Sequence, residues 1–132
     1  MNNLLVMKFG GTSVGSAERM RAAASLTAEQ RGKRPVAIVA SAMSKITDLL
    51  LDTMRHAEAG DRAGLETNLA KLRNRHVEAC RELLPESRHE AVLAGIQSLI
   101  AEFERITGGM LMLGARPDHP AVRLRLQPGG TE

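Results

Sequence analysis

The chain has 132 residues, of which 43% are hydrophobic and only 2% aromatic, and its formal net charge is +3. This length suffices for one modest hydrophobic core. The sequence contains two Phe and no Trp or Tyr, so it offers few rings on which nucleic-acid bases could stack. Its Lys and Arg residues are interspersed with Asp and Glu, as on solvated helix faces, and we expect no nucleic-acid partner.

The single cysteine, Cys80, excludes an internal disulfide and suits a reducing compartment. It lies within a helical pattern, which predicts a small buried side chain rather than a nucleophile. No apolar run approaches the length of a membrane span, and residues 1–3 lack the basic segment of a secretory signal. We therefore expect a cytoplasmic protein without membrane contact.

The first predicted element is a strand over residues 4–7, whose four consecutive apolar residues are typical of a parallel strand buried on both faces. Lys8 and Phe9 follow, and then the adjacent pair Gly10 and Gly11. Two glycines let the backbone turn closely and present consecutive N–H groups. A helix after this turn directs its positive end at the same place, which suits phosphate.

The glycine spacing differs from two common phosphate-binding motifs. Glycines at positions 10, 11 and 15 do not form G-x-G-x-x-G, and a P-loop lysine follows its glycines whereas Lys8 precedes them. A lysine at a strand end can still reach phosphate oxygens as a point charge. The alternative is an ordinary strand-to-helix turn with a surface lysine.

Ser16 is a candidate N-cap for the next helix, which Gly32 ends. A second continuous apolar run, residues 36–40, predicts a second strand. The order strand, helix, strand predicts a right-handed crossover with parallel strands. In open α/β sheets, ligands bind beyond the carboxyl ends of the strands. Lys8 and Ser41 both lie at that end.

Three helical stretches follow, each with apolar residues three and four positions apart. The first ends at Gly60 and carries Ile46, Leu49, Leu50, Met54 and Ala57. The second begins near Asp61, ends at Pro85 and carries Leu65, Leu69, Leu72, His76, Cys80 and Leu83. The third carries Val92, Ile96, Leu99, Phe103, Ile106, Met110 and Leu113, and Gly108–Gly109 is expected to kink or end it. The last two stretches predict an antiparallel helical hairpin, and no cluster with metal-ligand spacing predicts a metal site on the protein itself.

The string Lys8-Phe9-Gly10-Gly11-Thr12-Ser13-Val14-Gly15 resembles the N-terminal signature of aspartate kinases in the amino acid kinase family. The exit of the second strand, from Ser41 to Thr47, and the long helical pair ending in a Met- and Leu-rich segment are similar to the same family. The resemblance covers residues 1–114. It implies the N-terminal part of a three-layer α/β/α amino acid kinase domain, with parallel strands and a long helical hairpin.

The resemblance implies an aspartate kinase, or a truncated fragment of one, that transfers the γ-phosphoryl group of ATP to the side-chain carboxylate of L-aspartate. This reaction belongs to lysine, threonine and methionine biosynthesis. The implied cofactors are ATP and the Mg²⁺ that accompanies it, and the full-length relative is expected to be a homo-oligomer.

The same resemblance assigns roles to individual residues. It implies that Lys8 is catalytic, and that Thr47 binds aspartate. The residues implied to contact ATP or its phosphates are Lys8, Phe9, Gly10, Gly11, Thr12, Ser13 and Ser41.

Two alternatives stay open: another amino acid kinase acting on a carboxylate, carbamate or phosphate, and a non-catalytic helical module with an inert glycine turn. The two predicted buried strands argue against the second. The parent enzyme is either monofunctional or the kinase half of a fusion with homoserine dehydrogenase.

Residues 115–132 change character and predict an atypical, irregular tail. The family carries a short segment here whose Glu holds the substrate's amino group, and the nearest match is Gly130-Thr131-Glu132 at a different spacing. Our hypothesis is that this tail is an out-of-frame continuation of a truncated gene. Because the second nucleotide-binding half is missing, we expect the chain by itself to be inactive.

Overall fold

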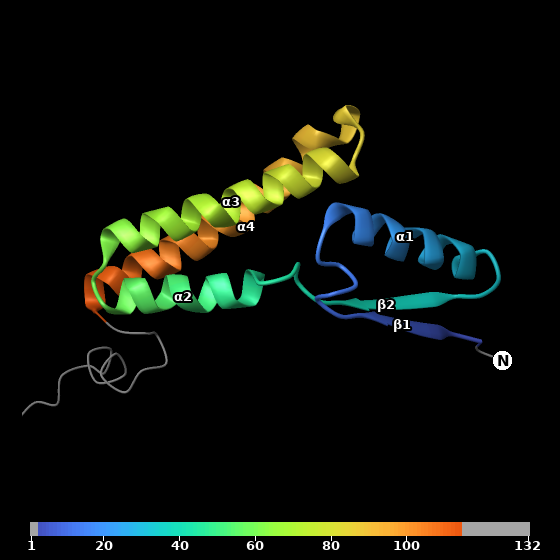
Figure 1. The fold of residues 1–132 in the computed structure, drawn as a ribbon, viewed down its shortest axis with the longest axis horizontal. Coiled ribbons are helices and arrows are strands. Elements are labelled where there is room, and N and C mark those ends of the chain that lie inside the picture. The colour runs from blue at the N-terminus through green and yellow to red at the C-terminus, as the bar shows by residue number, and fades with distance from the viewer. Residues whose placement is uncertain (1–2, 115–132) are drawn as a thin grey trace, which may run out of the picture. The chain divides into compact units, whose positions relative to one another are not determined.

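The computed structural model describes residues 3–114, which form two strands and four helices (Figure 1). In chain order the elements are β1 (Leu5–Phe9), α1 (Ala17–Arg31), β2 (Val36–Ala40), α2 (Ile46–Glu58), α3 (Arg62–Leu83) and α4 (Glu86–Leu113). They fall into two compact units, the first comprising the chain up to Thr47 together with His76–Leu93 and the second comprising Asp48–Arg75 together with the chain from Ala94. The predicted tail at 115–132 lies outside the described residues.

The first unit contains a parallel two-stranded sheet. β1 and β2 pair in a register that places Leu5 opposite Val36 and Phe9 opposite Ala40. Helix α1 connects the strands and lies against one face of this sheet (Figure 1). The predicted strand–helix–strand unit with parallel strands is therefore confirmed, although β1 runs further than predicted and includes Lys8 and Phe9.

The prediction that the first strand is buried on both faces is wrong for the part of the chain described. Burial alternates along β1: Leu5, Met7 and Phe9 are half-buried, whereas Val6 is 60% exposed and Lys8 is exposed. Side chains of a strand point alternately to opposite faces, and α1 covers only one of them. The continuous apolar run predicted that both faces of β1 are buried, but within the first unit only the face toward α1 is covered.

Helix α1 is fixed at both ends by local contacts. Ser16 is its N-cap, as predicted, because its Oγ accepts a hydrogen bond from Arg19 N at 3.3 Å. Gly32 follows the last helical residue, also as predicted. Within the first unit, the Arg21 guanidinium donates to the carbonyl oxygen of Glu82 near the end of α3 at 2.6 Å.

The second unit is a packed group of helices. Its core consists of Ala57 from α2, Leu65 and Leu69 from α3, and Met110 from α4, all less than 5% exposed. Met54, Phe103 and Leu111 pack around this core. The predicted apolar stripes on α2 and α3 are confirmed, since Leu72 and Cys80 on α3 are also buried.

Helix α4 differs from the prediction in two ways. It continues without a break through Gly108–Gly109 to Leu113, because Thr107 and Met110 on either side are buried and their packing offsets the low helix propensity of glycine. Its buried residues are Ile100, Thr107 and Met110, whereas Leu99 and Ile106 of the predicted stripe are 70% and 48% exposed. A helix with 3.6 residues per turn drifts away from a strict heptad stripe over this length.

None of the described helices is both long and apolar enough to cross a membrane.

A polar cluster joins α2 to α3 in the second unit. The His56 ring lies between two carboxylates, with Nδ1 2.8 Å from Asp61 Oδ2 and Nε2 3.3 Å from Asp52 Oδ2. Asn68 donates to the same Asp52 oxygen at 2.8 Å, and the Gly64 N–H donates to Asp61 Oδ1 at 3.0 Å. Asp61 thus satisfies a backbone donor in the first turn of α3.

These contacts predict a loss of stability in acid. The Gly64 N–H and the His56 ring hold the pKa of Asp61 below its ordinary value of 3.8, and the Asn68 amide does the same for the pKa of Asp52. A carboxyl with a lowered pKa in the folded state stabilises the fold above its unfolded pKa, and that contribution is lost as the pH falls through the folded pKa. We expect Asp61→Asn to reduce the dependence of the unfolding free energy on pH between about pH 5 and pH 2.

The measurement is urea denaturation followed by circular dichroism at a series of pH values. Glu66→Gln is the matched control, because Glu66 is an exposed carboxylate on α3 and should keep the wild-type pH dependence. An Asp61→Asn variant that keeps the wild-type dependence would contradict the stabilising role of Asp61.

Candidate functional site

The candidate site lies where β1 and β2 end. The Ser41 N–H donates to the Phe9 carbonyl oxygen at 2.9 Å, which extends the parallel pairing by one bond beyond β2. The Val14 N–H donates to the Gly10 carbonyl oxygen at 3.2 Å and closes the turn that follows β1. Two segments with hydroxyl and glycine residues are thereby held at the same end of the sheet, where ligands bind in open α/β folds.

Gly11 and Ser41 lie beside each other across these two exits. A Cβ placed on Gly11 would lie 3.7 Å from Ser41 Oγ and 3.7 Å from the Ala42 carbonyl oxygen. The structure therefore brings together two residues that were predicted to contact phosphate from different parts of the sequence. Gly10 is more open, since a Cβ there would meet nothing within 4 Å.

Buried apolar residues fix the position of both segments that follow the strands, the glycine turn after β1 and the residues after β2. Val14 and Ala17 are 7% and 4% exposed beside the glycine turn, and Met43 and Ile46 are 7% and 3% exposed after β2. In each of these two segments, exposed polar residues are interspersed with buried apolar residues. The buried residues hold the polar side chains at the surface. Thr12 and Ser13, both predicted to adjoin phosphate, are exposed in this turn.

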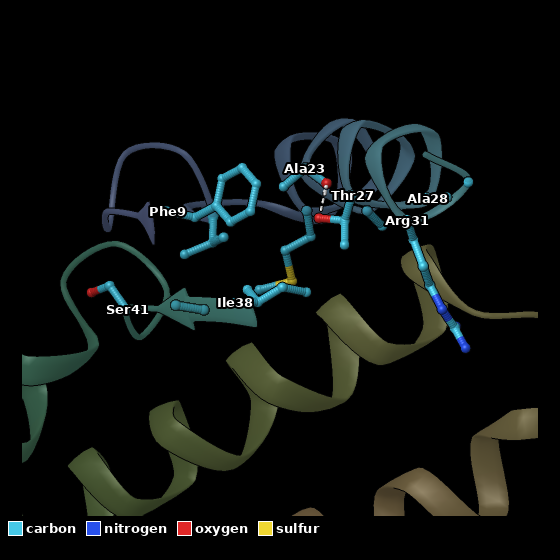
Figure 2. A pocket seen from close by; sticks show the side chains of 12 residues that line it. Phe9, Ala23, Thr27, Ala28, Arg31, Ile38 and Ser41 are labelled. Atoms are coloured by element: carbon cyan, nitrogen blue, oxygen red, sulfur yellow. Dashed lines mark hydrogen bonds between the residues drawn. The ribbon is translucent and has the colours of Figure 1, made fainter. Parts of the chain in front are cut away.

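Lys8 and Phe9 point to opposite faces of β1. Figure 2 shows the Phe9 ring beside α1, in an apolar groove that also includes Met20 and Ala23. Lys8, the neighbouring residue, is exposed and therefore projects from the other face. Phe9 thus has a packing role that the sequence did not indicate, and its contact with nucleotide stays a prediction.

A small polar pocket of about 270 Å³ adjoins the turn. It is lined by Thr12, Gly15, Ser16, Arg19 and Ser44. The Arg19 guanidinium reaches back from α1 and donates from Nη1 to the Thr12 carbonyl oxygen at 2.8 Å. Arg19 was not among the residues predicted from the sequence, although a cation in the first turn of a helix that follows a glycine turn is a signal that could have identified it.

Lys45 is a second residue that the sequence analysis did not select. It lies between β2 and α2 with φ at +64°, a left-handed conformation that non-glycine residues seldom adopt. Such backbone strain is concentrated at functional sites. Thr47, the predicted aspartate-binding residue, is exposed in the first turn of α2 two positions later.

The chemistry of these exits fits phosphate oxygens. Backbone N–H groups, hydroxyls and cationic side chains are the donors that phosphate accepts. Among residues 3–114, no group of three His, Cys, Asp or Glu side chains is placed to hold a metal ion. The hydroxyls, backbone N–H groups and cations of the described exits are thus the kind of donors that an anionic ligand accepts.

Comparison with known proteins identifies the family. The model of the amino acid kinase family matches residues 3–115. The chain belongs to this family. The α/β fold with a parallel sheet followed by long helices agrees with the N-terminal part of such a domain, as the sequence predicted.

Some of the relatives to which this chain is similar are named for one enzymatic activity and others for two. The chain is 36% identical over 92 residues to a bifunctional aspartokinase/homoserine dehydrogenase of Daucus carota, a match covering 70% of the chain and 10% of the relative. It is 39% identical over 98 residues to Aspartokinase 2 of Arabidopsis thaliana, which covers 72% and 18%, respectively. It is 46% identical over 57 residues to an aspartokinase of Bacillus sp. (strain MGA3), covering 42% and 14%. The chain thus spans less than a fifth of the length of these relatives.

Gly15 should be the most sensitive glycine of the turn to an added methyl group. Its Cβ would lie 3.0 Å from the Gly11 carbonyl oxygen, 3.3 Å from Ser44 Cβ and 3.4 Å from the Thr12 carbonyl oxygen. Because two of these neighbours are backbone atoms of the same turn, we expect Gly15→Ala to destabilise the protein by about 1–3 kcal/mol.

Urea denaturation measures this difference, and Gly10→Ala is the control because its Cβ meets nothing within 4 Å. Equal stability of the two variants would show that the turn is not packed around Gly15 as described.

Proposed function

We propose that the chain carries the phosphate-binding part of an aspartate kinase, which transfers the γ-phosphoryl group of ATP to the side-chain carboxylate of L-aspartate. The observation that carries this proposal is the pairing of the two strand exits, since the Ser41–Phe9 hydrogen bond places Ser41 beside Gly11. The aspartokinase names of the relatives support the choice of reaction within the family.

The chain's own groups supply positioning and charge in this proposal. The N–H groups of Gly10 and Gly11 donate to phosphate oxygens, and the hydroxyls of Thr12, Ser13 and Ser41 add further donors. The Lys8 ammonium stabilises the negative charge of the transferring phosphoryl group. Phosphoryl transfer depends mainly on such positioning and electrostatic stabilisation.

ATP supplies the phosphoryl group, and Mg²⁺ bound to its phosphates neutralises part of their charge. The described residues hold the phosphates rather than the ion, because the glycine turn and the exit of β2 from Ser41 to Thr47 contain no carboxylate. Lys45 adds a cation to the exit of β2.

Thr47 is proposed to bind aspartate. Its exposed hydroxyl lies in the first turn of α2, where the helix dipole favours a carboxylate. The product, an acyl phosphate, would enter lysine, threonine and methionine biosynthesis. Residues beyond this chain would have to supply the rest of the nucleotide site, since the relatives named above are more than five times longer than their matched segments. We place the enzyme in the cytoplasm, as a homo-oligomer in its full-length form.

Lys8→Ala tests this proposal in a full-length aspartokinase whose N-terminal segment is replaced by residues 1–114. Removing one preorganised charge interaction with a developing anion commonly lowers turnover by about 10²–10³, or roughly 3–4 kcal/mol. We expect a loss of this size in aspartyl phosphate formation, measured as the hydroxamate. Lys8→Arg should restore little, because a planar guanidinium does not replace a compact ammonium beside a tight turn.

Lys33→Ala is the matched control, because Lys33 is an exposed lysine whose ammonium lies 3.8 Å from Glu29 Oε1, outside the site. It should keep normal turnover, and both variants should stay within about 0.5 kcal/mol of wild-type stability. Near-normal turnover of the Lys8→Ala variant would show that Lys8 is a solvated surface residue without a catalytic role, and would contradict the proposal.

A further inference from the structure

The glycine turn after β1 is a single turn of helix. Its closing bond, from the Val14 N–H to the Gly10 carbonyl oxygen at 3.2 Å, joins residues four positions apart, and no residue between Gly10 and Gly15 has a positive φ. The next helix, α1, begins only at Ala17. An isolated helical turn gains one internal hydrogen bond for the several residues that it fixes, so it is unstable by itself. Contacts from outside the turn therefore have to stabilise it.

Arg19 supplies such a contact from the first turn of α1. Its Nη1 donates to the Thr12 carbonyl oxygen at 2.8 Å, across seven positions of the chain. The carbonyl groups of a helical turn point toward its C-terminal end, where they lack partners inside the turn. An arginine near that end can bond a free carbonyl, and its charge offsets the negative end of the turn's dipole. Arg19 therefore caps the carbonyl end of the glycine turn.

This contact opposes the local preferences of α1. The Arg19 N–H donates to Ser16 Oγ at 3.3 Å, which makes Ser16 the N-cap and Arg19 the third residue of the helix. Glutamate and glutamine are typical of this third position, because their side chains return to the N-cap and a negative charge suits the positive end of the helix dipole. A cation there is unfavourable for the helix. Arginine at this position is therefore explained by its bond to the glycine turn and not by α1 itself.

The same contact determines which way the N–H groups of the turn point. In a planar trans peptide the N–H and C=O groups point in opposite directions, and no peptide bond within residues 3–114 is cis. Since the Thr12 carbonyl points to the Arg19 guanidinium, the Ser13 N–H of the same peptide points away from it. The first N–H groups of a helical turn have no acceptor inside the turn. The N–H end of the glycine turn thus lies on the side away from Arg19, where it can donate to an anion.

We propose that Arg19 is a positioning residue of the phosphate site. It fixes the carbonyl end of the glycine turn, so that the N–H end is oriented for a phosphate group before the nucleotide binds. Arg19 does not contact the ligand and acts through the Thr12 peptide. This inference rests on the proposed function, because it takes the phosphates of ATP as the ligand of the turn. Donors that are ordered in advance bind more tightly, since binding then requires little further ordering.

Hydrogen exchange of the 132-residue chain tests the hold on the turn without any nucleotide. Arg19→Met removes the donors and the charge but keeps an unbranched side chain with a high helix propensity. The Val14 amide, whose bond closes the glycine turn, should then exchange about tenfold faster. The amide of Leu69, in the core of the second unit, should not change. Arg19→Lys keeps a cationic donor and should restore part of the protection of Val14.

An NMR titration tests the effect on phosphate, with ATP–Mg²⁺ and inorganic tripolyphosphate as ligands. Arg19→Met should bind both about tenfold more weakly than the wild type, because both ligands use the N–H end of the turn. Arg21→Met is the matched control. Arg21 lies on the same helix and its guanidinium also donates to a backbone carbonyl oxygen, at 2.6 Å, but that carbonyl belongs to Glu82 of α3. This variant should keep the wild-type affinities and the wild-type exchange of Val14.

Unchanged exchange of Val14 in Arg19→Met would overturn the proposal. If the affinity alone fell, Arg19 would be a direct phosphate ligand, and if neither changed, it would be a solvated surface residue. Faster exchange with unchanged affinity would also overturn it, because the order of the turn would then not affect phosphate binding. A wild-type chain that binds neither ligand would instead contradict the proposed function, and the exchange of Val14 would still decide whether Arg19 holds the turn.

Discussion

The hydrogen bond from the Ser41 N–H to the Phe9 carbonyl oxygen is the contact on which the candidate site depends. It extends the parallel pairing of β1 and β2 by one residue, and so determines where the two exit segments begin. Gly11 and Ser41 become neighbours only because both strands end at the same level. Buried Val14 and Met43 then hold each exit segment from below and keep its polar residues at the surface.

Much of this arrangement could be predicted from local sequence. The apolar runs, the Ser16 cap and the apolar face of α3 all depend on neighbouring residues, and the structure contains each of them. The glycine turn at the end of β1 was predictable for the same reason, because two adjacent glycines directly after a strand have few other uses.

Other features depend on contacts that no local pattern records. β1 and β2 have exposed faces because few of the described elements pack against them. A run of apolar residues does not indicate how many elements will cover a strand. The packing of Phe9 against α1 and the return of Arg19 to Thr12 are likewise set by the path of the turn. Leu99 of α4 belongs to the predicted apolar stripe but is exposed. A heptad stripe thus predicts which face of a helix is apolar, but not which residues of that face pack against another helix.

The central claim is that the glycine turn and the exit of β2 form one phosphate site. A ¹⁵N–¹H NMR titration of the chain with ATP and Mg²⁺ tests it most directly, because weak binding by part of a site still shifts the amide resonances nearest the ligand. We expect the shifts to concentrate at Gly10, Gly11 and Ser41, with none at Leu69 in the core of the second unit. Shifts confined to other residues, or none at millimolar nucleotide, would contradict it.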